Sequence, residues 1–501
     1  MHGRRAALVV LALYLATRLP CLTTLPMFLD ESWHIAWSMW IAEGKEWDSP
    51  WLFGKGVSIF VNALLFPWAG DQYLAATRLV TVSFGALTLF GVYFTARRLY
   101  DQETALVGSL LYVFCPYALF YDRLVLTDPV QSAFAALSML WSVRVAQSGR
   151  IADGIVLGLW LALSVFAKAL GVLVFLTPAL AFVLLPRDRA ACRRAFGVAY
   201  ATSAAMVAYP LLRFFMTTST VRAAIDKSAE GPLGRVLDNA PLAFEWVSKY
   251  WTLPVLVLAV AGLAAATFRR SRPGLLLGGL VVLPLLAFLA ISTLWFPRYL
   301  VFLTPPVAIL AGATLTGATR WAAARTLART TPPAWAWLLG LALVLGPALR
   351  FDVLLWSDPA RAPLPEVERF QFVDGWPSGY GVRETIAFVK QQAERHKGGV
   401  RVVLQSNARR TIAFASSVAF RYDGFVVVDD LRLDDPASPA TLATWARELP
   451  TFVVIPIPHR GRRPPPDALP PGARLVLETR KPDGTLCDQV YEVCPDSACG
   501  N

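Results

Sequence analysis

The chain has 501 residues, of which 55% are hydrophobic and only 16% are charged, and its mean hydropathy is +0.49. These values exclude an ordinary soluble protein, because a soluble chain of this length would carry a much higher share of charged residues. The net charge of +12 does not indicate a nucleic-acid partner, since residues 351–501 hold 18 basic and 19 acidic residues and the excess lies in the apolar part.

The apolar part predicts an α-helical polytopic membrane protein. A bilayer core takes roughly 20 apolar residues per helix, and about eleven runs approach that length. The predicted spans are residues 6–26, 78–96, 102–120, 128–143, 152–167, 169–186, 195–215, 250–268, 274–292, 299–318 and 334–350. We therefore expect residues 1–350 to form a transmembrane domain.

The distribution of Lys and Arg sets the expected orientation. On the side of the N-terminus, the pieces between spans hold 16 Lys and Arg among 46 residues, against 9 among 99 on the opposite side. Cytoplasmic loops carry such an excess. We expect an N-terminus in the cytoplasm, a multi-pass protein of the cell (inner) membrane, and an extracytoplasmic C-terminus.

The first extracytoplasmic loop, residues 27–77, begins with the acidic pair Asp30 and Glu31. Its aromatic-rich pieces predict helices that lie in the membrane interface. Adjacent helical residues do not share a face, so one carboxylate could do chemistry while the other binds a metal or a neighbour. The other interpretation is a helix cap, since Asp favours that position. His34 follows Asp30 by one turn and could orient it or share a metal.

Three more charged residues are expected on the same membrane face. Asp128 precedes Pro129 at the start of the predicted span 128–143, where it could simply cap a helix. Lys168 and Arg298 could be interfacial anchors. Both cations oppose the positive-inside trend, however, and an anionic headgroup such as a phosphate would explain them. For Arg123 we expect an ion pair with its neighbour Asp122.

Residues 351–501 predict a soluble extracytoplasmic α/β domain. A helical pattern, "VRETIAFVKQQAERH", is followed by five short runs of strand length: "VRVVLQ", "FVVVDD", "TFVVIP", "RLVLE" and "QVYEV". In this domain we expect a disulfide between Cys487 and either Cys494 or Cys499 if the compartment is oxidising.

Four segments occur in order that resemble one family: "LDESWHIAWSMWIAEGK", "RLVLTDPVQSAF", "LSVFAKALGVLVFLTPALAFVLL" and "FPRYLVFLTPPVAILAG". The chain is similar to the GT-C superfamily of membrane glycosyltransferases, and within it to the protein O-mannosyltransferase and lipid A aminoarabinose transferase group. The resemblance covers roughly residues 5–320. Two positions depart from it, because many relatives have Gly where this chain has Ala169 and an aromatic or other residue where it has His34.

The resemblance implies transfer of a hexosyl or pentosyl group from a polyprenyl-phosphate sugar to a protein, lipid or polysaccharide acceptor outside the membrane. It assigns Asp30, Glu31 and Asp128 to catalytic positions. It assigns Lys168 and Arg298 to the donor phosphate, and His34, Arg123 and Tyr299 are candidate supporting residues. Whether Glu31 or Asp128 also holds a divalent metal is left open.

The residues themselves agree with this chemistry. Attack by an acceptor hydroxyl needs a base, here Asp30, and the leaving phosphate needs cations. Direct displacement predicts inversion at the anomeric carbon. One alternative is a lipid or solute transporter without bond chemistry, although transporters place their charges near the bilayer midplane and often contain sequence repeats. A second alternative is a structural or assembly protein whose outer domain binds a partner, with the acidic pair as a simple helix cap.

Overall fold

The computed structural model describes residues 2–47, 54–217, 232–293, 295–326, 331–405, 415–416, 418–420, 426–433, 435–457 and 469–494. Its contacts divide the chain into two compact units. The first comprises Met1–Leu22, Glu46–Asn62 and Arg78–Pro365, and the second comprises Thr23–Lys45, Ala63–Thr77 and Glu366–Asn501. The residues of the predicted first loop are therefore shared between the units.

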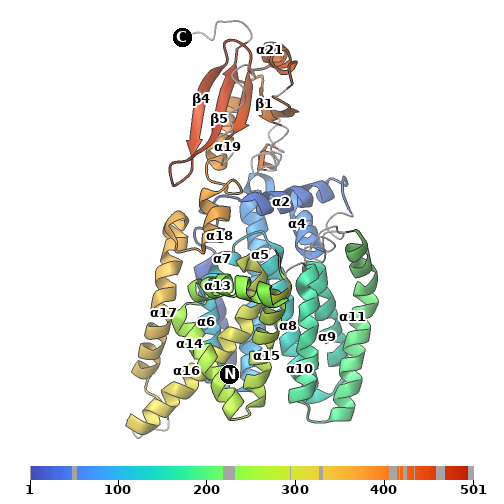
Figure 1. Cartoon of the computed structure of the whole chain (residues 1–501), viewed down its shortest axis with the longest axis vertical. Coiled ribbons are helices and arrows are strands. Elements are labelled where there is room, and N and C mark those ends of the chain that lie inside the picture. Colours follow the sequence, from blue (N-terminus) through green and yellow to red (C-terminus); the bar gives the residue numbers. More distant parts are fainter. Residues whose placement is uncertain are drawn as a thin grey trace. The chain divides into compact units, whose positions relative to one another are not determined.

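Helices make up the first unit (Figure 1). They are α1 (His2–Arg18), α6 (Gln102–Val113), α7 (Pro116–Tyr121), α8 (Thr127–Ser148), α9 (Ile151–Ala167), η2 (Ala169–Phe175), α10 (Leu176–Leu184), α11 (Arg189–Thr217), α13 (Pro232–Tyr250), α14 (Leu253–Phe268), α15 (Arg272–Ile291), η3 (Pro297–Leu303), α16 (Thr304–Thr326), α17 (Ala334–Ser357) and η4 (Pro359–Arg361). Two helices, α4 (Gly56–Ala69) and α5 (Tyr73–Leu99), continue from one unit into the other, with the short η1 (Gly70–Gln72) between them.

Each predicted span coincides at least in part with a helix, but fewer helices are long and apolar enough to cross a membrane. Among the described residues four segments qualify: Gly56–Leu99, Arg272–Ile291, Pro297–Arg325 and Ala334–Ser357. A fifth qualifies if α13 and α14, which meet at 111°, count as one broken span. The first predicted span is too long, since α1 ends at Arg18, where Pro20 disfavours a helical residue before it.

Small residues let the helices of this unit approach one another closely. A Cβ on Gly154 of α9 would lie 2.2 Å from the carbonyl oxygen of Ala195 on α11. A Cβ on Gly312 of α16 would lie 2.7 Å from the Cα of Gly108 on α6. Small residues at helix contacts are typical of membrane bundles, where van der Waals packing holds helices together.

Helix α13 differs from its neighbours, because it crosses the direction that α14, α15 and α16 share (Figure 1). Leu233, Leu237 and Phe244 form an exposed apolar stripe at a spacing of four and seven residues. Asn239 and Trp246 lie on another face and are buried. A helix with an exposed apolar stripe suits a position along the membrane surface.

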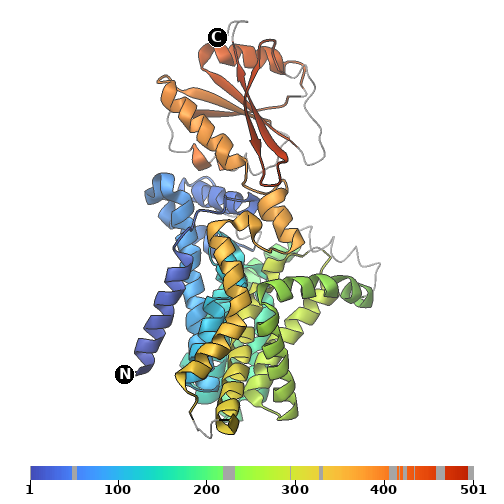
Figure 2. The same cartoon turned by 90° about the vertical axis from the view of Figure 1, so that its left-hand side faces the viewer.

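The second unit contains α2 (Leu29–Ala42) and the C-terminal α/β domain (Figure 2). The elements of this domain are α18 (Glu366–Arg369), η5 (Phe370–Asp374), α19 (Val382–Arg395), β1 (Val400–Gln405), β2 (Val426–Leu431), α21 (Ser438–Glu448), β3 (Thr451–Pro456), β4 (Arg474–Arg480) and β5 (Leu486–Val493). The five predicted strands and the predicted helix over residues 382–396 are confirmed.

The sheet has the order β2-β1-β3-β5-β4. Strand β1 pairs in parallel with β2 and β3, whereas β5 pairs antiparallel with β3 and β4. Apolar residues of α21, Leu442 and Ala446, share a core with Val403 and Val453 of the central strands. The predicted disulfide of Cys487 is wrong, because Cys487 is a free thiol while Cys494 is disulfide-bonded.

Candidate active site

The acidic pair of the first loop lies in the first turn of α2. Glu31 is fully buried, and its Oε2 accepts a hydrogen bond from the Phe28 N–H at 3.4 Å. Phe28 is the N-cap residue, so Glu31, and not Asp30, supplies the carboxylate that caps the helix. Asp30 is half-buried, and His34 is buried one turn later.

The remaining predicted residues belong to the first unit, and two of them form an ion pair. Lys168 Nζ donates a hydrogen bond to Asp128 Oδ1. Side-chain exposure is 12% for Lys168 and 4% for Asp128. Asp128 does not cap α8, because the helix begins at Thr127 and its N-cap is Leu126. From the first turn of α8 the carboxylate instead reaches a partner 40 residues away in the sequence.

Lys168 lies at a break between two helices, where the backbone conformation sets the direction of its side chain. Lys168 is extended, with φ −160° and ψ 136°, between the end of α9 and the start of η2. The Gly171 N–H donates to the Lys168 carbonyl at 2.7 Å, and a Cβ on Gly171 would lie 2.2 Å from the Ser164 carbonyl oxygen. The Ala169 N–H donates to the Gly54 carbonyl at 3.1 Å, which ties the break to the backbone before α4.

Arg298 and Tyr299 join this cluster from η3. The Lys168 ammonium lies 3.8 Å from the centre of the Tyr299 ring, a distance at which a cation is attracted to a ring face. The Arg298 guanidinium lies 4.7 Å from the Phe296 ring and 5.8 Å from the Tyr299 ring. We name Asp128, Lys168, Arg298 and Tyr299 the cationic cluster.

The electrostatics of Lys168 reveal one residue that the sequence analysis missed. Burial, together with the positive charges of Arg298 and Lys55, lowers the pKa of Lys168 to about 8, against the opposing effect of Asp128. Lys55 follows Gly54, whose carbonyl accepts the Ala169 N–H at 3.1 Å, so its backbone lies next to the segment that carries Lys168. It could have been found by the same argument as Lys168, since it is a cation on the extracytoplasmic side of the predicted topology.

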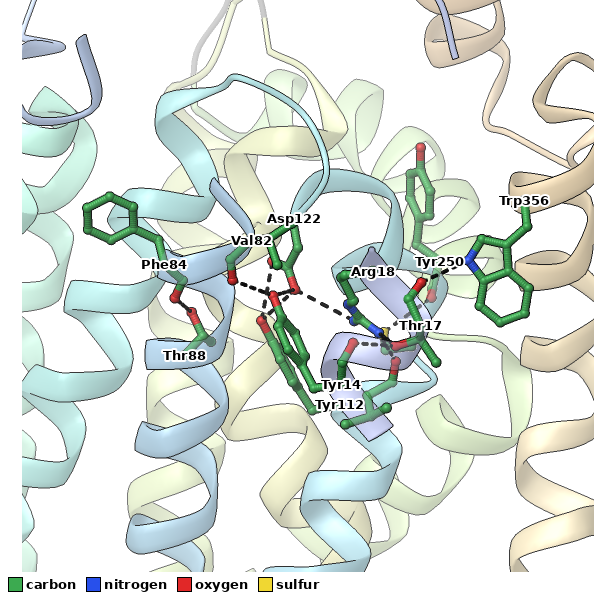
Figure 3. A network of polar contacts seen from close by, with 12 residues as sticks. Tyr14, Thr17, Arg18, Val82, Phe84, Thr88, Tyr112, Asp122, Tyr250 and Trp356 are labelled. Carbon is green, nitrogen blue, oxygen red and sulfur yellow. Dashed lines mark hydrogen bonds and ion pairs between the residues drawn. The ribbon is translucent and has the colours of Figure 1, made fainter. Parts of the chain in front are cut away.

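The predicted pair of Asp122 with Arg123 is wrong, because Asp122 bonds to residues of other helices (Figure 3). Tyr14 and Tyr112 donate hydrogen bonds to Asp122 Oδ2 at 3.2 and 3.1 Å, and Arg18 Nη2 lies 3.6 Å from the same oxygen. All four side chains are buried. A buried carboxylate such as Asp122 needs hydrogen-bond or ion-pair partners. These contacts join α1 and α6 to the turn after α7.

Arg123 also binds elsewhere. Its Nη2 donates to the carbonyl of Pro20, at 3.1 Å, and to that of Cys21. Arg123 is thus a support for the turn after α1, and the structure does not bring it into the cationic cluster.

An apolar crevice is lined by the elements that carry the cluster. Met139 of α8, Val174 of η2 and Phe302 of η3 contribute to it, together with Leu280 of α15 and residues of α10 and α16. Thr177 is the polar residue in its lining. In the described part of the chain, no three His, Cys, Asp or Glu side chains come together as metal ligands.

Comparison with known families and sequences gives one partial match. Residues 57–216 match the family model described as dolichyl-phosphate-mannose-protein mannosyltransferase. This segment includes Asp128 and Lys168. A comparison with curated protein sequences finds no match.

Comparison with solved structures extends over almost the whole chain. ArnT from Cupriavidus metallidurans bound to undecaprenyl phosphate aligns with a TM-score of 0.59 and 14% identity, over 99% of this chain and 99% of that chain. The oligosaccharyltransferase AglB from Archaeoglobus fulgidus, in complex with an inhibitory peptide and a dolichol-phosphate, aligns with a TM-score of 0.53 and 11% identity, over 91% of this chain and 69% of that chain. The predicted fold class is confirmed: both units follow the architecture of these proteins.

Proposed function

We propose that this chain, which has the fold of the GT-C membrane glycosyltransferases, moves a sugar from a polyprenyl-phosphate donor to an acceptor on the extracytoplasmic face. The acceptor would be a protein, a lipid or a polysaccharide, and the sugar a hexose or a pentose. The membrane would be the cell membrane, with the C-terminal domain outside.

The observation that carries this proposal is the cationic cluster. Lys168 and Arg298 come from segments far apart in the sequence and both lie at the Tyr299 ring, with Asp128 as a carboxylate partner. Two cations beside one carboxylate leave a net positive charge, which suits the phosphate of the donor and the negative charge that this phosphate gains when the sugar leaves.

The apolar crevice lies beside the proposed phosphate site but is too small for a lipid chain. Residues of η2 and η3, the elements that follow Lys168 and contain Arg298, line it, so an apolar surface adjoins the cations, yet its cavity volume of about 20 Å³ is room for about one water. The aligned ArnT structure contains undecaprenyl phosphate and the aligned AglB structure contains a dolichol-phosphate, which are lipids of this class.

In the proposed reaction the oxygen of an acceptor hydroxyl attacks the anomeric carbon from the side opposite the phosphate. The bond between this carbon and the phosphate oxygen breaks, and the configuration inverts. Asp30 would accept the hydroxyl proton, while Lys168 and Arg298 stabilise the departing polyprenyl phosphate. Asp30 is the better candidate of the acidic pair, because the Glu31 carboxylate already caps α2.

The test compares wild type with Asp30→Asn in lipid nanodiscs against a panel of polyprenyl-phosphate sugars. We expect one donor to be transferred or hydrolysed by wild type. The Asp30→Asn variant should be slower by about 100-fold or more, because a general base contributes at least that factor. Its affinity for the donor should stay unchanged. Glu31→Gln is the matched control, since its amide oxygen still accepts the Phe28 N–H bond, and it should keep most of the activity.

Two results would contradict the proposal. If wild type neither binds nor consumes a donor from a broad panel, the chain is no glycosyltransferase of this type, and transport assays would follow. If Glu31→Gln is inactive while Asp30→Asn is active, the assignment of the base to Asp30 is wrong.

A further inference from the structure

Asn239 of α13 holds the chain immediately before the cationic cluster. The side chain is buried, with 8% exposure. Its Nδ2 donates to the carbonyl oxygens of Leu289 and Ser292, both at 3.0 Å, at the end of α15. Its Oδ1 accepts a hydrogen bond from Trp295 Nε1 at 3.0 Å. The amide therefore uses both N–H donors and its oxygen on one short stretch of chain.

Trp295 is fixed in this position by packing as well. It is buried, its ring centre lies 4.6 Å from that of Trp246 on α13, and it stacks on Phe288 of α15 at 6.1 Å. A buried indole N–H without a partner is unfavourable, so the bond to Asn239 favours this single arrangement.

Short contacts connect Trp295 to Arg298 and Tyr299. The Pro297 carbonyl accepts a hydrogen bond from the Tyr117 hydroxyl of α7. The Tyr299 N–H donates to the Phe296 carbonyl at 3.0 Å, and the Arg298 guanidinium lies over the Phe296 ring. The backbone of this stretch is thus held on both sides, by α13 through Asn239 and by α7 through Tyr117.

We propose that Asn239 is a positioning residue that acts through Trp295 to place Arg298 and Tyr299 beside Lys168, and so sets the affinity of the site for a polyprenyl phosphate. The inference rests on the proposed function, since it assigns a role at the same phosphate site. Asn239 does not itself touch the lipid; it supplies the geometry that the Arg298 side chain needs.

The experiment measures the binding of undecaprenyl phosphate and of neutral undecaprenol to the full chain in nanodiscs. We expect Asn239→Ala to weaken undecaprenyl phosphate binding about tenfold, because two carbonyls and one indole N–H lose their partner. Undecaprenol binding should be unchanged. Ser203→Ala is the matched control, since its buried hydroxyl donates to the Tyr200 carbonyl within α11 and not to the stretch of chain before the cluster.

A double-mutant cycle separates positioning from general destabilisation. In an Arg298→Ala background, Asn239→Ala should cause no further loss of phosphate affinity, because its effect passes through Arg298. Trp295→Phe removes the indole N–H and keeps a ring, so it should reproduce part of the loss of phosphate affinity. This variant replaces Asn239→Ala in the test if Asn239→Ala folds poorly.

The possible failures can be told apart. If wild type does not bind undecaprenyl phosphate, or Arg298→Ala binds it as well as wild type, the proposed phosphate site is wrong. If Arg298→Ala weakens binding but Asn239→Ala and Trp295→Phe do not, only the positioning role is wrong. Equal and additive losses for both lipids would show that Asn239 is merely structural.

Discussion

Lys168 owes its properties to the groups that surround its ammonium. Burial and the positive charges of Arg298 and Lys55 disfavour the charged form, while the Asp128 carboxylate favours it. The balance leaves the pKa at about 8, close to neutral pH. A cation of this kind can bind a phosphate and also lose its charge within an accessible pH range.

The first prediction at the residue scale concerns the pH dependence of lipid binding. Lys168 is charged below its pKa of about 8, so the affinity of wild type for undecaprenyl phosphate should fall as pH rises through this value. Asp128→Asn removes the group that raises this pKa, and the fall should therefore occur at lower pH. Binding titrations at a series of pH values in nanodiscs would measure both profiles.

Lys168→Arg is the control for this prediction, because a guanidinium keeps its charge throughout that range. Its affinity should be flat across the same pH values. A parallel loss in wild type and Lys168→Arg would show that another group titrates and would contradict the prediction.

At the scale of single elements, the break between α9 and η2 sets the direction of the Lys168 side chain toward its partners. In an unbroken helix, the helical period would fix the direction of the side chain at position 168. The extended backbone at Lys168 removes that constraint, and the close approach of Gly171 to the last turn of α9 makes the break compact. A residue with a Cβ cannot fit there without a shift of the backbone.

We therefore expect Gly171→Ala to destabilise the protein by about 1–3 kcal/mol, the usual cost of overpacking, and to weaken undecaprenyl phosphate binding. Gly197→Ala in α11 is the matched control, because a Cβ there meets no atom within 4 Å. In a helix interior this change should be neutral or stabilising by up to about 1 kcal/mol. Thermal unfolding in nanodiscs checks both, and equal melting temperatures would contradict the prediction.

The whole molecule combines a unit of helices with a unit that contains a small sheet. The exposed apolar side chains of the first unit, such as Leu339 and Leu343 of α17, suit a lipid environment. The distribution of Lys and Arg predicts the side on which the sheet domain lies.

The prediction at this scale is the orientation of the chain, tested by cysteine labelling in spheroplasts. A membrane-impermeant maleimide should label Asp483→Cys, an exposed position between β4 and β5, in intact spheroplasts. Arg194→Cys, exposed on α11, should react only after lysis. A Cys21→Ser background removes the free thiol that is exposed among the described residues. The reverse labelling pattern would overturn the proposed topology.

Helix and strand assignments could be predicted because they depend on local patterns. The apolar runs and the strand-length segments of residues 351–501 each matched an element, since hydropathy and side-chain period are properties of neighbouring residues. The number of segments able to cross a membrane was less well predicted, because helix ends and bends such as the one before α14 change the length of each span.

The sequence by itself determined the class of the protein and most of the residues of its candidate site, because charges among apolar runs are conspicuous in any chain of this composition. Only the tertiary structure decided the partners: Asp128 with Lys168, Arg18 with Asp122, and Glu31 as a helix cap. Such pairs join segments that are distant in the chain or depend on where a helix begins. The two ion pairs follow from helix packing, which no local pattern of residues encodes.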